Sequence, residues 1–268
     1  MKLSLSFSQR FILLVLLLVL GLLISGAMQT LLSHVSDNTV AVARISAFAQ
    51  GFLAFILPAV VLAVMVTRLP AEFLMIKKLP GLKSLCLAVG ALLVSFPAIE
   101  YISHLCSLMP WPQEVIEFET QAEAQTMKLL GFHNLPNLLV SILVVGVLTG
   151  LAEELFFRGA LQRLFQTRPM SVHAAVWITA VLFSIMHVQM VGFIPRMLLG
   201  ALFGYAAIWT GSLWTAVILH ILNNTCVIMT IWWEIDMISN PIVAVLSVVI
   251  AIFLAYRLKS SKVCNINP

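Results

Sequence analysis

Long runs of apolar residues, separated by short polar segments, dominate the chain. Each run is about twenty residues long, which is enough for a helix to cross the hydrocarbon core of a membrane. Within lipid the backbone must pair its own N–H and C=O groups, so continuous apolar runs predict helices rather than a barrel. We expect an all-α, polytopic bundle of about eight transmembrane helices near residues 11–31, 45–66, 84–107, 138–160, 174–191, 195–210, 213–233 and 241–256.

The charges between the apolar runs predict the topology. Residues 67–83 carry Arg68, Lys77, Lys78 and Lys83, whereas residues 108–137 carry four glutamates and one lysine. Basic loops stay in the cytoplasm, so the chain is expected to be N-in and C-in. The polar stretch 113–131 is expected to lie on the outer surface as an interfacial helix, with a lid as the alternative. The joints between 174 and 213 are weakly marked, so one pair of helices there could be re-entrant.

Composition supports this class of protein. The chain has 268 residues, of which 61% are hydrophobic and 10% charged, and its mean hydropathy is +1.06. We therefore expect one multi-pass domain over 1–268, with accessory helices over 1–110, in a bacterial plasma (inner) membrane. The net charge of +4 follows the loops and indicates no nucleic-acid partner. The four cysteines lack paired spacing, so neither a disulfide nor a cysteine metal site is expected.

The segment Glu153-Glu154-Leu155-Phe156-Phe157-Arg158 places three charges inside one apolar run. A charge at the centre of a membrane helix costs roughly 2.5–3.5 kcal/mol, so such residues are usually functional or paired. Glu154 and Arg158 are four residues apart and can pair on one helix face. Glu153 follows Gly146 and Gly150 on the face that packs closest to other helices, so it is expected to face the bundle interior.

Two interpretations of these carboxylates remain open. A desolvated Glu153 could take a proton from water and pass it to a leaving amine. Alternatively, the cluster could be a buried salt bridge that fixes helix register without chemistry, a reading that fits Glu154 and Arg158 better than Glu153.

Two further polar groups lie in later apolar runs. Phe183 and His187 share one helical face, and His220 shares a face with Asn224, beside Asn223. A single histidine in an apolar helix is more often a satisfied core residue than a catalytic one. The asparagines could orient an imidazole, stabilise an oxyanion or hold two helices together.

Taken together, these residues favour a functional site over separate structural roles. A polar side chain without a partner in lipid is unfavourable, so the most stable arrangement brings these side chains together. One carboxylate and two imidazoles resemble either a divalent-metal site or a water-activating site, with Glu153, His187 and His220 as candidate ligands. The chain contains no H-E-x-x-H, no G-x-S-x-G and no Asp inside a predicted span. These absences argue against the zincin pattern and against serine or aspartyl intramembrane proteolysis.

The order E-E-x-x-x-R, F-x-x-x-H and H-x-x-x-N over successive spans resembles the CPBP (Abi) family, which includes type II CAAX prenyl endopeptidases and bacteriocin self-immunity proteins. The resemblance covers a core at 138–233 and implies an intramembrane endopeptidase whose polar cavity opens towards the cytoplasmic side. It implies that Glu153 activates water, supported by Glu154 and Arg158. His187 and His220 would bind the water or a metal, and Asn224 the oxyanion or second imidazole.

The resemblance also implies cofactors and partners. It implies a metalloprotease that holds a divalent metal, for which we expect Zn²⁺, although a glutamate-and-histidine mechanism without tightly held metal stays open. The expected substrate is a membrane-associated peptide or protein, CAAX-lipidated or not. The Gly146-x-x-x-Gly150 and Gly200-x-x-x-Gly204 patterns predict packing within the bundle, with homodimerisation as the weaker alternative.

Two other functions fit parts of the pattern. A non-catalytic scaffold or bacteriocin self-immunity protein would keep the same residues for packing. A transporter or proton relay also uses intramembrane Glu and His, but it predicts inverted repeats that this sequence lacks.

The predicted spans place Glu153 and His187 at different depths in the membrane. Glu153 lies about 15 residues into its span from the outer side, near 22 Å, and His187 about 13 residues into the next span from the inner side, near 20 Å. In a core of about 30 Å these depths differ by roughly 10 Å. We expect the fourth helix to begin later and to extend past Arg163.

Overall fold

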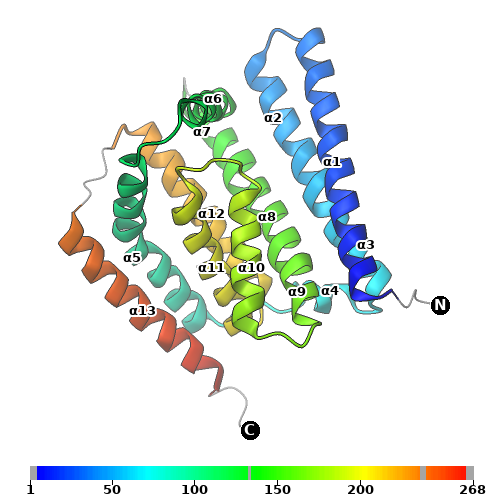
Figure 1. The fold of residues 1–268 in the computed structure, drawn as a ribbon, viewed down its shortest axis with the longest axis vertical. Helices are drawn as coiled ribbons and strands as arrows, with labels where there is room; N and C mark the ends of the chain where they lie inside the picture. The colour runs from blue at the N-terminus through cyan, green and yellow to red at the C-terminus, as the bar shows by residue number, and fades with distance from the viewer. Residues whose placement is uncertain (1–4, 132–133, 236–239, 264–268) are drawn as a thin grey trace.

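In a computed structural model the chain forms an antiparallel helical bundle, and the structure describes residues 5–131, 134–235 and 240–263. These residues contain helices and no strands, which confirms the predicted all-α class (Figure 1). The first half comprises α1 (Phe7–Val35), α2 (Thr39–Gln50), η1 (Gly51–Ile56), α3 (Leu57–Val66), α4 (Pro70–Phe73), α5 (Leu82–Ser107) and α6 (Gln113–Leu130). The second half comprises α7 (Leu135–Ser141), η2 (Ile142–Leu148), α8 (Thr149–Glu154), η3 (Leu155–Gln162), α9 (Arg163–Gln166), α10 (Val172–Ile185), α11 (Phe193–Thr210), α12 (Leu213–Trp232) and α13 (Pro241–Val263).

Seven helical segments of the described chain are long and apolar enough to cross a membrane. Two of them run through several elements without a break, at Thr39–Val66 and Leu135–Gln166. The fifth predicted span, 174–191, is not among them: it is the 14-residue helix α10, which ends at Ile185. At 1.5 Å per residue α10 is about 21 Å long, shorter than the hydrocarbon core. Hydropathy alone overestimated this helix because the loop after it is also apolar.

The two ends of the bundle differ in charge. One end, at the bottom of Figure 1, contains the connections from α3 to α5, from α9 to α10 and from α11 to α12. We call it the basic end, because Arg68, Lys77, Lys78 and Arg168 lie in these connections. The opposite, acidic end contains the α1–α2 turn, α6, the α10–α11 loop and the end of α12, with Asp37, Glu114, Glu117 and Glu234.

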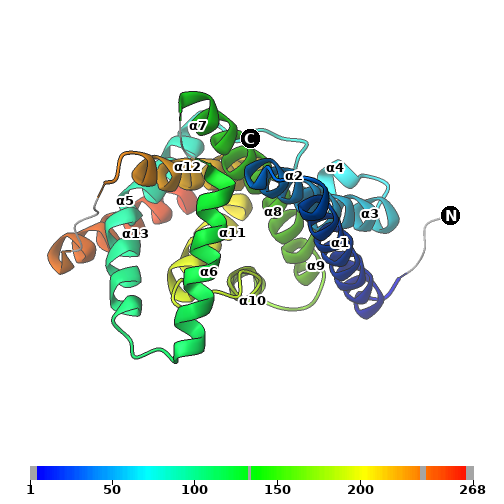
Figure 2. The same ribbon diagram turned by 90° about the horizontal axis from the view of Figure 1, so that it is seen from above.

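The polar stretch 113–131 forms α6, as predicted, and α6 lies across the acidic end of the bundle (Figure 2). Its last turn is fixed by Arg44 of α2, whose guanidinium donates to the carbonyls of Leu129 and Leu130 and to Asn137 Oδ1. The helix then ends at Gly131, which has φ +56°. Further along α6, the Glu119 carboxylate accepts the N–H of Val191 in the α10–α11 loop at 2.9 Å. A side chain from α2 and one from α6 thus join α6 to both halves of the bundle.

The span Leu135–Gln166 alternates α-helical and π-helical turns. The short α8, which carries both glutamates, lies between the π-helical segments η2 and η3. A π turn contains more residues than an α turn, so this 32-residue span is shorter than a regular helix of equal length. The fourth helix extends past Arg163, as expected, but it begins at Leu135, earlier than 138 rather than later.

Glycines bring the helices of the central bundle into close contact. A Cβ at Gly150 would lie 3.3 Å from Ile221 Cγ1, and one at Gly146 would lie 3.2 Å from Thr225 Oγ1, so α8 and η2 pack directly on α12. On α11, the space beside Gly200 holds the Arg158 guanidinium, and the space beside Gly204 holds the Gln162 amide. All four glycines are buried within one chain, in agreement with the packing interpretation of both Gly-x-x-x-Gly patterns.

Candidate active site

The charged cluster at Glu154 is buried, and the Glu154 carboxylate pairs with Arg158, although Glu154 Oε2 and Arg158 Nε have no hydrogen-bond partner among the described residues. Glu154 Oε1 accepts from Arg158 Nη1 at 2.5 Å on its own span and contacts His220 Nδ1 on α12 at 2.7 Å. Arg158 also donates to the Gly200 carbonyl at 2.8 Å, and its guanidinium lies 4.6 Å from the centre of the Phe183 ring. A buried ion pair is stable only when geometry and additional hydrogen bonds offset desolvation. The cluster therefore fixes the position of the His220 ring.

The Glu153 side chain lies in a different environment from that of Glu154. Its side chain faces α12, and its Oε2 lies 3.7 Å from His220 Nε2, outside hydrogen-bond range. Among the described residues, Glu153 Oε2 is a buried oxygen without a hydrogen-bond partner. A polar gap of this length commonly holds a water molecule. Sequence spacing divided the two glutamates in the same way: Glu154 pairs with Arg158, and Glu153 is left for partners on other helices.

His187 approaches the same region from the α10–α11 loop. The helix ends before it, so the prediction of a helical Phe183-x-x-x-His187 face is wrong in that detail. His187 Nδ1 nevertheless donates to the Phe183 carbonyl at 2.9 Å, which maintains a helix-like spacing. The next residue, Val188, has φ +58°, a left-handed conformation that strains a β-branched residue by about 1–3 kcal/mol. Local strain beside a site residue is common at functional sites.

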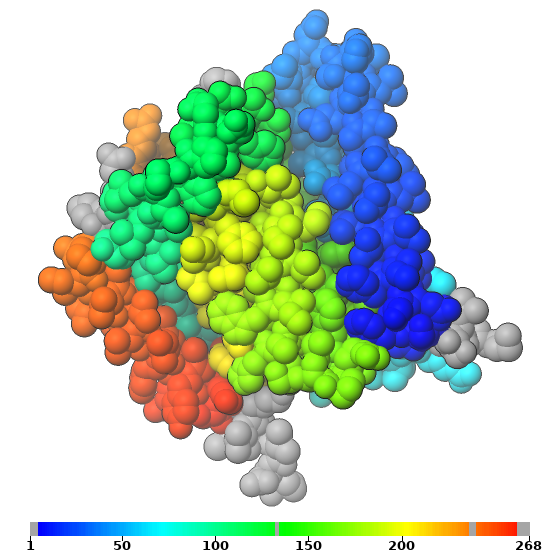
Figure 3. All heavy atoms as spheres, viewed as in Figure 1, coloured from blue at the N-terminus to red at the C-terminus, as the bar shows by residue number. Residues whose placement is uncertain are grey.

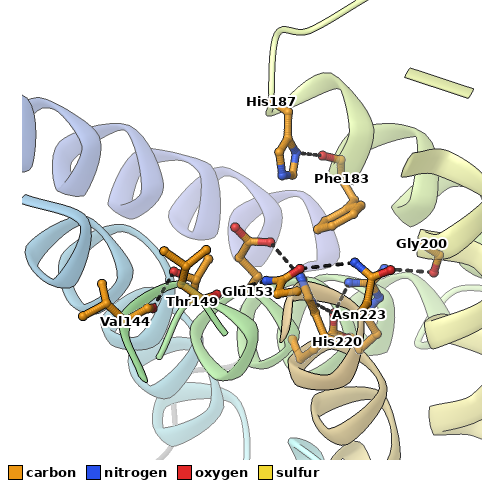
Figure 4. A network of polar contacts seen from close by, with 12 residues as sticks. Val144, Thr149, Glu153, Phe183, His187, Gly200, His220 and Asn223 are labelled. Carbon is orange, nitrogen blue, oxygen red and sulfur yellow. Dashed lines mark hydrogen bonds and ion pairs between the residues drawn. The ribbon is translucent and has the colours of Figure 1, made fainter. Parts of the chain in front are cut away.

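Both imidazoles are oriented in the same way. His220 Nδ1 contacts the Glu154 carboxylate and His187 Nδ1 contacts the Phe183 carbonyl, so each Nε2 is left for the site. The Phe183 ring lies between them, with its centre 5.0 Å from that of His187 and 5.9 Å from that of His220 (Figure 4). Burial lowers the pKa of His187, although the Glu153 carboxylate acts in the opposite direction. Burial therefore favours the neutral form of the His187 imidazole.

Asn224 forms hydrogen bonds with Val145 and Asn223. Its amide donates to the Val145 carbonyl on η2 at 3.0 Å and accepts from Asn223 Nδ2 at 3.2 Å. It therefore connects α12 to the π-helical segment before the glutamates, the helix-bridging alternative considered for these asparagines. Within the described parts of the chain Asn224 forms no hydrogen bond with an imidazole, so its role at the oxyanion stays a prediction.

A cavity of about 340 Å³ adjoins the site, between α5, α11 and α12. His187, His220 and Asn223 line it together with apolar side chains such as Phe96, Leu199 and Phe203. Two charged residues that the sequence analysis did not select, Glu100 of α5 and Arg196 of α11, also line it. Glu100 is a carboxylate inside an apolar span, so the rule that selected Glu153 would have found it. Arg196 was not selected as a site residue, because it lies in the first turn of α11, just after a loop.

The predicted metal ligands do not converge. Within the described parts of the chain, no group of three or more His, Cys, Asp or Glu side chains is close enough to hold a metal ion. Glu153 and His220 approach each other to 3.7 Å, but His187 does not complete a set with them. The donor types suit a divalent ion, whereas their arrangement does not fit three-residue coordination.

Comparison with protein families identifies the segment that carries these residues. Residues 135–226 match the family described as type II CAAX prenyl endopeptidase Rce1-like, in agreement with the resemblance inferred from the three motifs. The matched segment contains Glu153, Glu154, Arg158, His187, His220 and Asn224. No significant match was found among curated proteins or among solved structures.

Proposed function

We propose that this chain, which carries an Rce1-like domain over residues 135–226, is an intramembrane endopeptidase that hydrolyses peptide bonds with water activated by Glu153. The family supports peptidase activity of the CAAX protease type, and the apolar helices support a multi-pass membrane protein. The observation that carries the proposal is the Glu153 carboxylate, buried and unpaired beside an imidazole whose other nitrogen is fixed by Glu154.

The proposed reaction begins with a water molecule between Glu153 Oε2 and His220 Nε2. Glu153 accepts a proton from this water as the oxygen attacks the peptide carbonyl, and the proton then passes to the leaving amine. Because the N–H of His220 lies on Nδ1, the neutral ring has a lone pair at Nε2, which can accept the second hydrogen of the water and orient it. Glu154 and Arg158 act as positioning residues, because they hold His220 and do not reach the reacting atoms.

A metal-assisted version is the second candidate. It is supported by the two histidines, whose Nδ1 atoms are occupied while their Nε2 atoms remain for a ligand, as in many metal-binding histidines. Elemental analysis of the purified protein tests this candidate. A stoichiometric divalent ion that is lost in both His187→Ala and His220→Ala would support it, and full activity after chelation, with no bound ion, would contradict it.

The proposed substrates are membrane-associated peptides, lipidated or not, and the proposed location is a bacterial plasma membrane with the basic end in the cytoplasm. The charges of the connecting segments support this orientation. A non-catalytic scaffold or self-immunity protein remains the alternative from another functional class.

The decisive experiment compares wild type with Glu153→Ala and Glu153→Gln in proteoliposomes, using a screen of lipidated and unlipidated membrane-anchored peptides. We expect wild type to cleave part of the screen and both variants to lose at least about 10³-fold in rate, since general acid–base catalysis contributes roughly 10²–10⁴-fold. Glu123→Gln, on the exposed face of α6, is the surface control. Unfolding temperatures of the variants separate lost catalysis from lost folding. Cleavage that persists in Glu153→Ala would contradict the proposal.

A further inference from the structure

The cavity of about 340 Å³ beside the candidate active site is bordered on one side by a single face of α5. The side chains that α5 contributes follow the i, i+3, i+4 and i+7 spacing of a helical face: Phe96, Ile99, Glu100 and Ser103. In Figure 3, α5 (teal) lies directly beside α11 (yellow), which borders the same cavity. The whole of α5 lies outside residues 135–226, so this wall is an addition to the segment that matches the family.

Glu100 is the charge that α5 contributes to the cavity. It lies inside the membrane span Leu82–Ser107, about two turns before the end of the helix. Within the described parts of the chain, its carboxylate forms neither a hydrogen bond nor an ion pair. An unpaired charge at membrane depth is unfavourable, and such residues usually have a partner or a function. The carboxylate is therefore suited to a cation that enters the cavity.

Arg196, the other charge that was not selected from the sequence, already has partners. Its Nη2 donates to Gln189 Oε1 at 2.9 Å. The carboxylates of Glu119 and Glu153 also act on it electrostatically. Arg196 forms no ion pair with Glu100 among the described residues. The two charges of the cavity thus differ, because only that of Glu100 is left without compensation.

The remaining lining favours a long basic side chain. Phe96, Leu199 and Phe203 give the cavity apolar walls. Lysine and arginine bury an apolar stem along such surface and place a charged group at its end, where a carboxylate forms a strong hydrogen bond with it. A divalent ion fits less well, because Ca²⁺ and Mg²⁺ take about six or more oxygen ligands. In the part of the chain that the structure describes, no three His, Cys, Asp or Glu side chains are grouped to hold a metal.

The position of the cavity connects Glu100 with the site of cleavage. His187 and His220 line the same cavity, and His220 Nε2 lies 3.7 Å from Glu153 Oε2. A side chain held at Glu100 therefore belongs to a residue close to the peptide bond that is cleaved. Glu100 itself has no contact with Glu153 or either imidazole among the described ion pairs and hydrogen bonds, so it would select the substrate without taking part in the chemistry.

We propose that Glu100 is a specificity-determining residue, which binds the cationic side chain of a lysine or arginine close to the cleaved bond of the substrate. This inference rests on the proposed peptidase function, because the peptide is bound at the same site. It narrows the substrate class to membrane-associated peptides with a basic residue near the cleavage point.

The charge of the cavity can be measured without catalysis. Cys226 lines the cavity, and Ser103→Cys adds a second thiol to it in a chain whose other cysteines are replaced by serine. Each thiol is modified with a trimethylammonioethyl and with a sulfonatoethyl methanethiosulfonate, which are similar in size and opposite in charge. Glu100→Gln should lower the ratio of the cationic to the anionic rate about five-fold or more, since charges act strongly where water is scarce. Glu123→Gln, exposed on α6 and outside the cavity, should leave the ratio unchanged.

Two results of this measurement would overturn the proposal. An unchanged ratio in Glu100→Gln would show that Glu100 carries no charge in the cavity. Failure of the cationic reagent to modify either thiol would show that the cavity excludes cations.

Substrate choice is tested with acetylated membrane-anchored peptides that carry lysine, arginine, norleucine or glutamate at each position around the cleaved bond. At one position wild type should prefer lysine or arginine over norleucine by about 10-fold in KM, as expected for a hydrogen bond between charged groups. Glu100→Gln should lose this preference, and Glu100→Lys should transfer it to glutamate. The same preference in Glu100→Gln as in wild type would contradict the proposal. A wild type that cleaves no peptide would overturn the peptidase function and the substrate assignment with it, whereas the thiol ratio decides separately whether Glu100 attracts cations.

Discussion

The buried charges around Glu154 differ from the uncharged polar side chains that line a second cavity, of about 660 Å³, between α1, α2 and α6, which we call the polar groove. Glu154 Oε1 pairs with Arg158 at 2.5 Å and with His220 at 2.7 Å, whereas Glu154 Oε2 and Arg158 Nε have no hydrogen-bond partner among the described residues. In the groove, the hydroxyls of Thr30, Ser33 and Thr126 donate to carbonyls of their own helices. Ser46 Oγ has no partner among the described residues. Burying an unpaired charge costs much more free energy than burying an unpaired amide or hydroxyl, so a charge inside the membrane needs a partner within the protein. The charged cluster therefore fixes the relative positions of η3, α11 and α12.

The largest effect is expected from breaking the charged cluster at Arg158. Arg158→Met leaves the buried Glu154 carboxylate without its main cation, so the free energy of unfolding should fall by about 3–5 kcal/mol. Adding Glu154→Gln removes the uncompensated charge and should restore part of the loss. Thermal unfolding in detergent measures both. Lys77→Met, which breaks the exposed pair with Glu72, is the matched control and should change stability by less than about 1 kcal/mol.

Glu154→Gln alone should separate positioning from catalysis. The amide retains the size of the carboxylate but weakens the contact that fixes His220 Nδ1, so the peptidase rate should fall about 10–100-fold, as for other residues that orient a catalytic histidine. The loss should be in kcat, with KM nearly unchanged. A loss as complete as that of Glu153→Ala would mean that Glu154 itself reacts with the substrate.

Close packing below the site is expected to have an intermediate effect. Gly150→Ala places a methyl group 3.3 Å from Ile221 Cγ1 and 3.4 Å from the Ile221 backbone nitrogen, so it should lower the free energy of unfolding by about 1–3 kcal/mol. Gly26→Ala, with nothing within 4 Å of the added Cβ, is the matched control on α1. The control should be neutral or slightly stabilising, since alanine favours helices. Equal effects of both substitutions would show that α8 and α12 are less closely packed than the structure indicates.

The smallest effect on stability is expected in the groove. Ser46→Ala removes a buried hydroxyl that has no partner among the described residues, so the free energy of unfolding should not fall, and thermal unfolding in detergent measures this. A large loss of stability would show that the hydroxyl serves the fold, and the contrast between the two regions would then disappear.

The sequence predicted the charged part of the site because each charge is conspicuous in an apolar run. Glu154 and Arg158 pair at four-residue spacing as expected, and Glu153 faces α12. The three motifs do not include Glu100, although it is also a charge inside a predicted span. The sequence analysis also missed Ser46 and Gln50, because single uncharged polar residues barely lower the hydropathy of a span and have no characteristic spacing.

The sequence fixes which residues are charged, apolar or glycine, and this was sufficient to predict a helical membrane protein and the pairing of Glu154 with Arg158 within one helix. Periodicity along one helix is a local property, so it identifies the face on which Glu153 lies. Tertiary structure alone decided that Glu154, rather than Glu153, holds His220, that Asn224 contacts Val145, and that His187 lies between two cavities. These facts depend on the relative depth and rotation of different helices. That arrangement results from many small packing contacts and the π-helical turns, which leave no pattern in one segment of sequence.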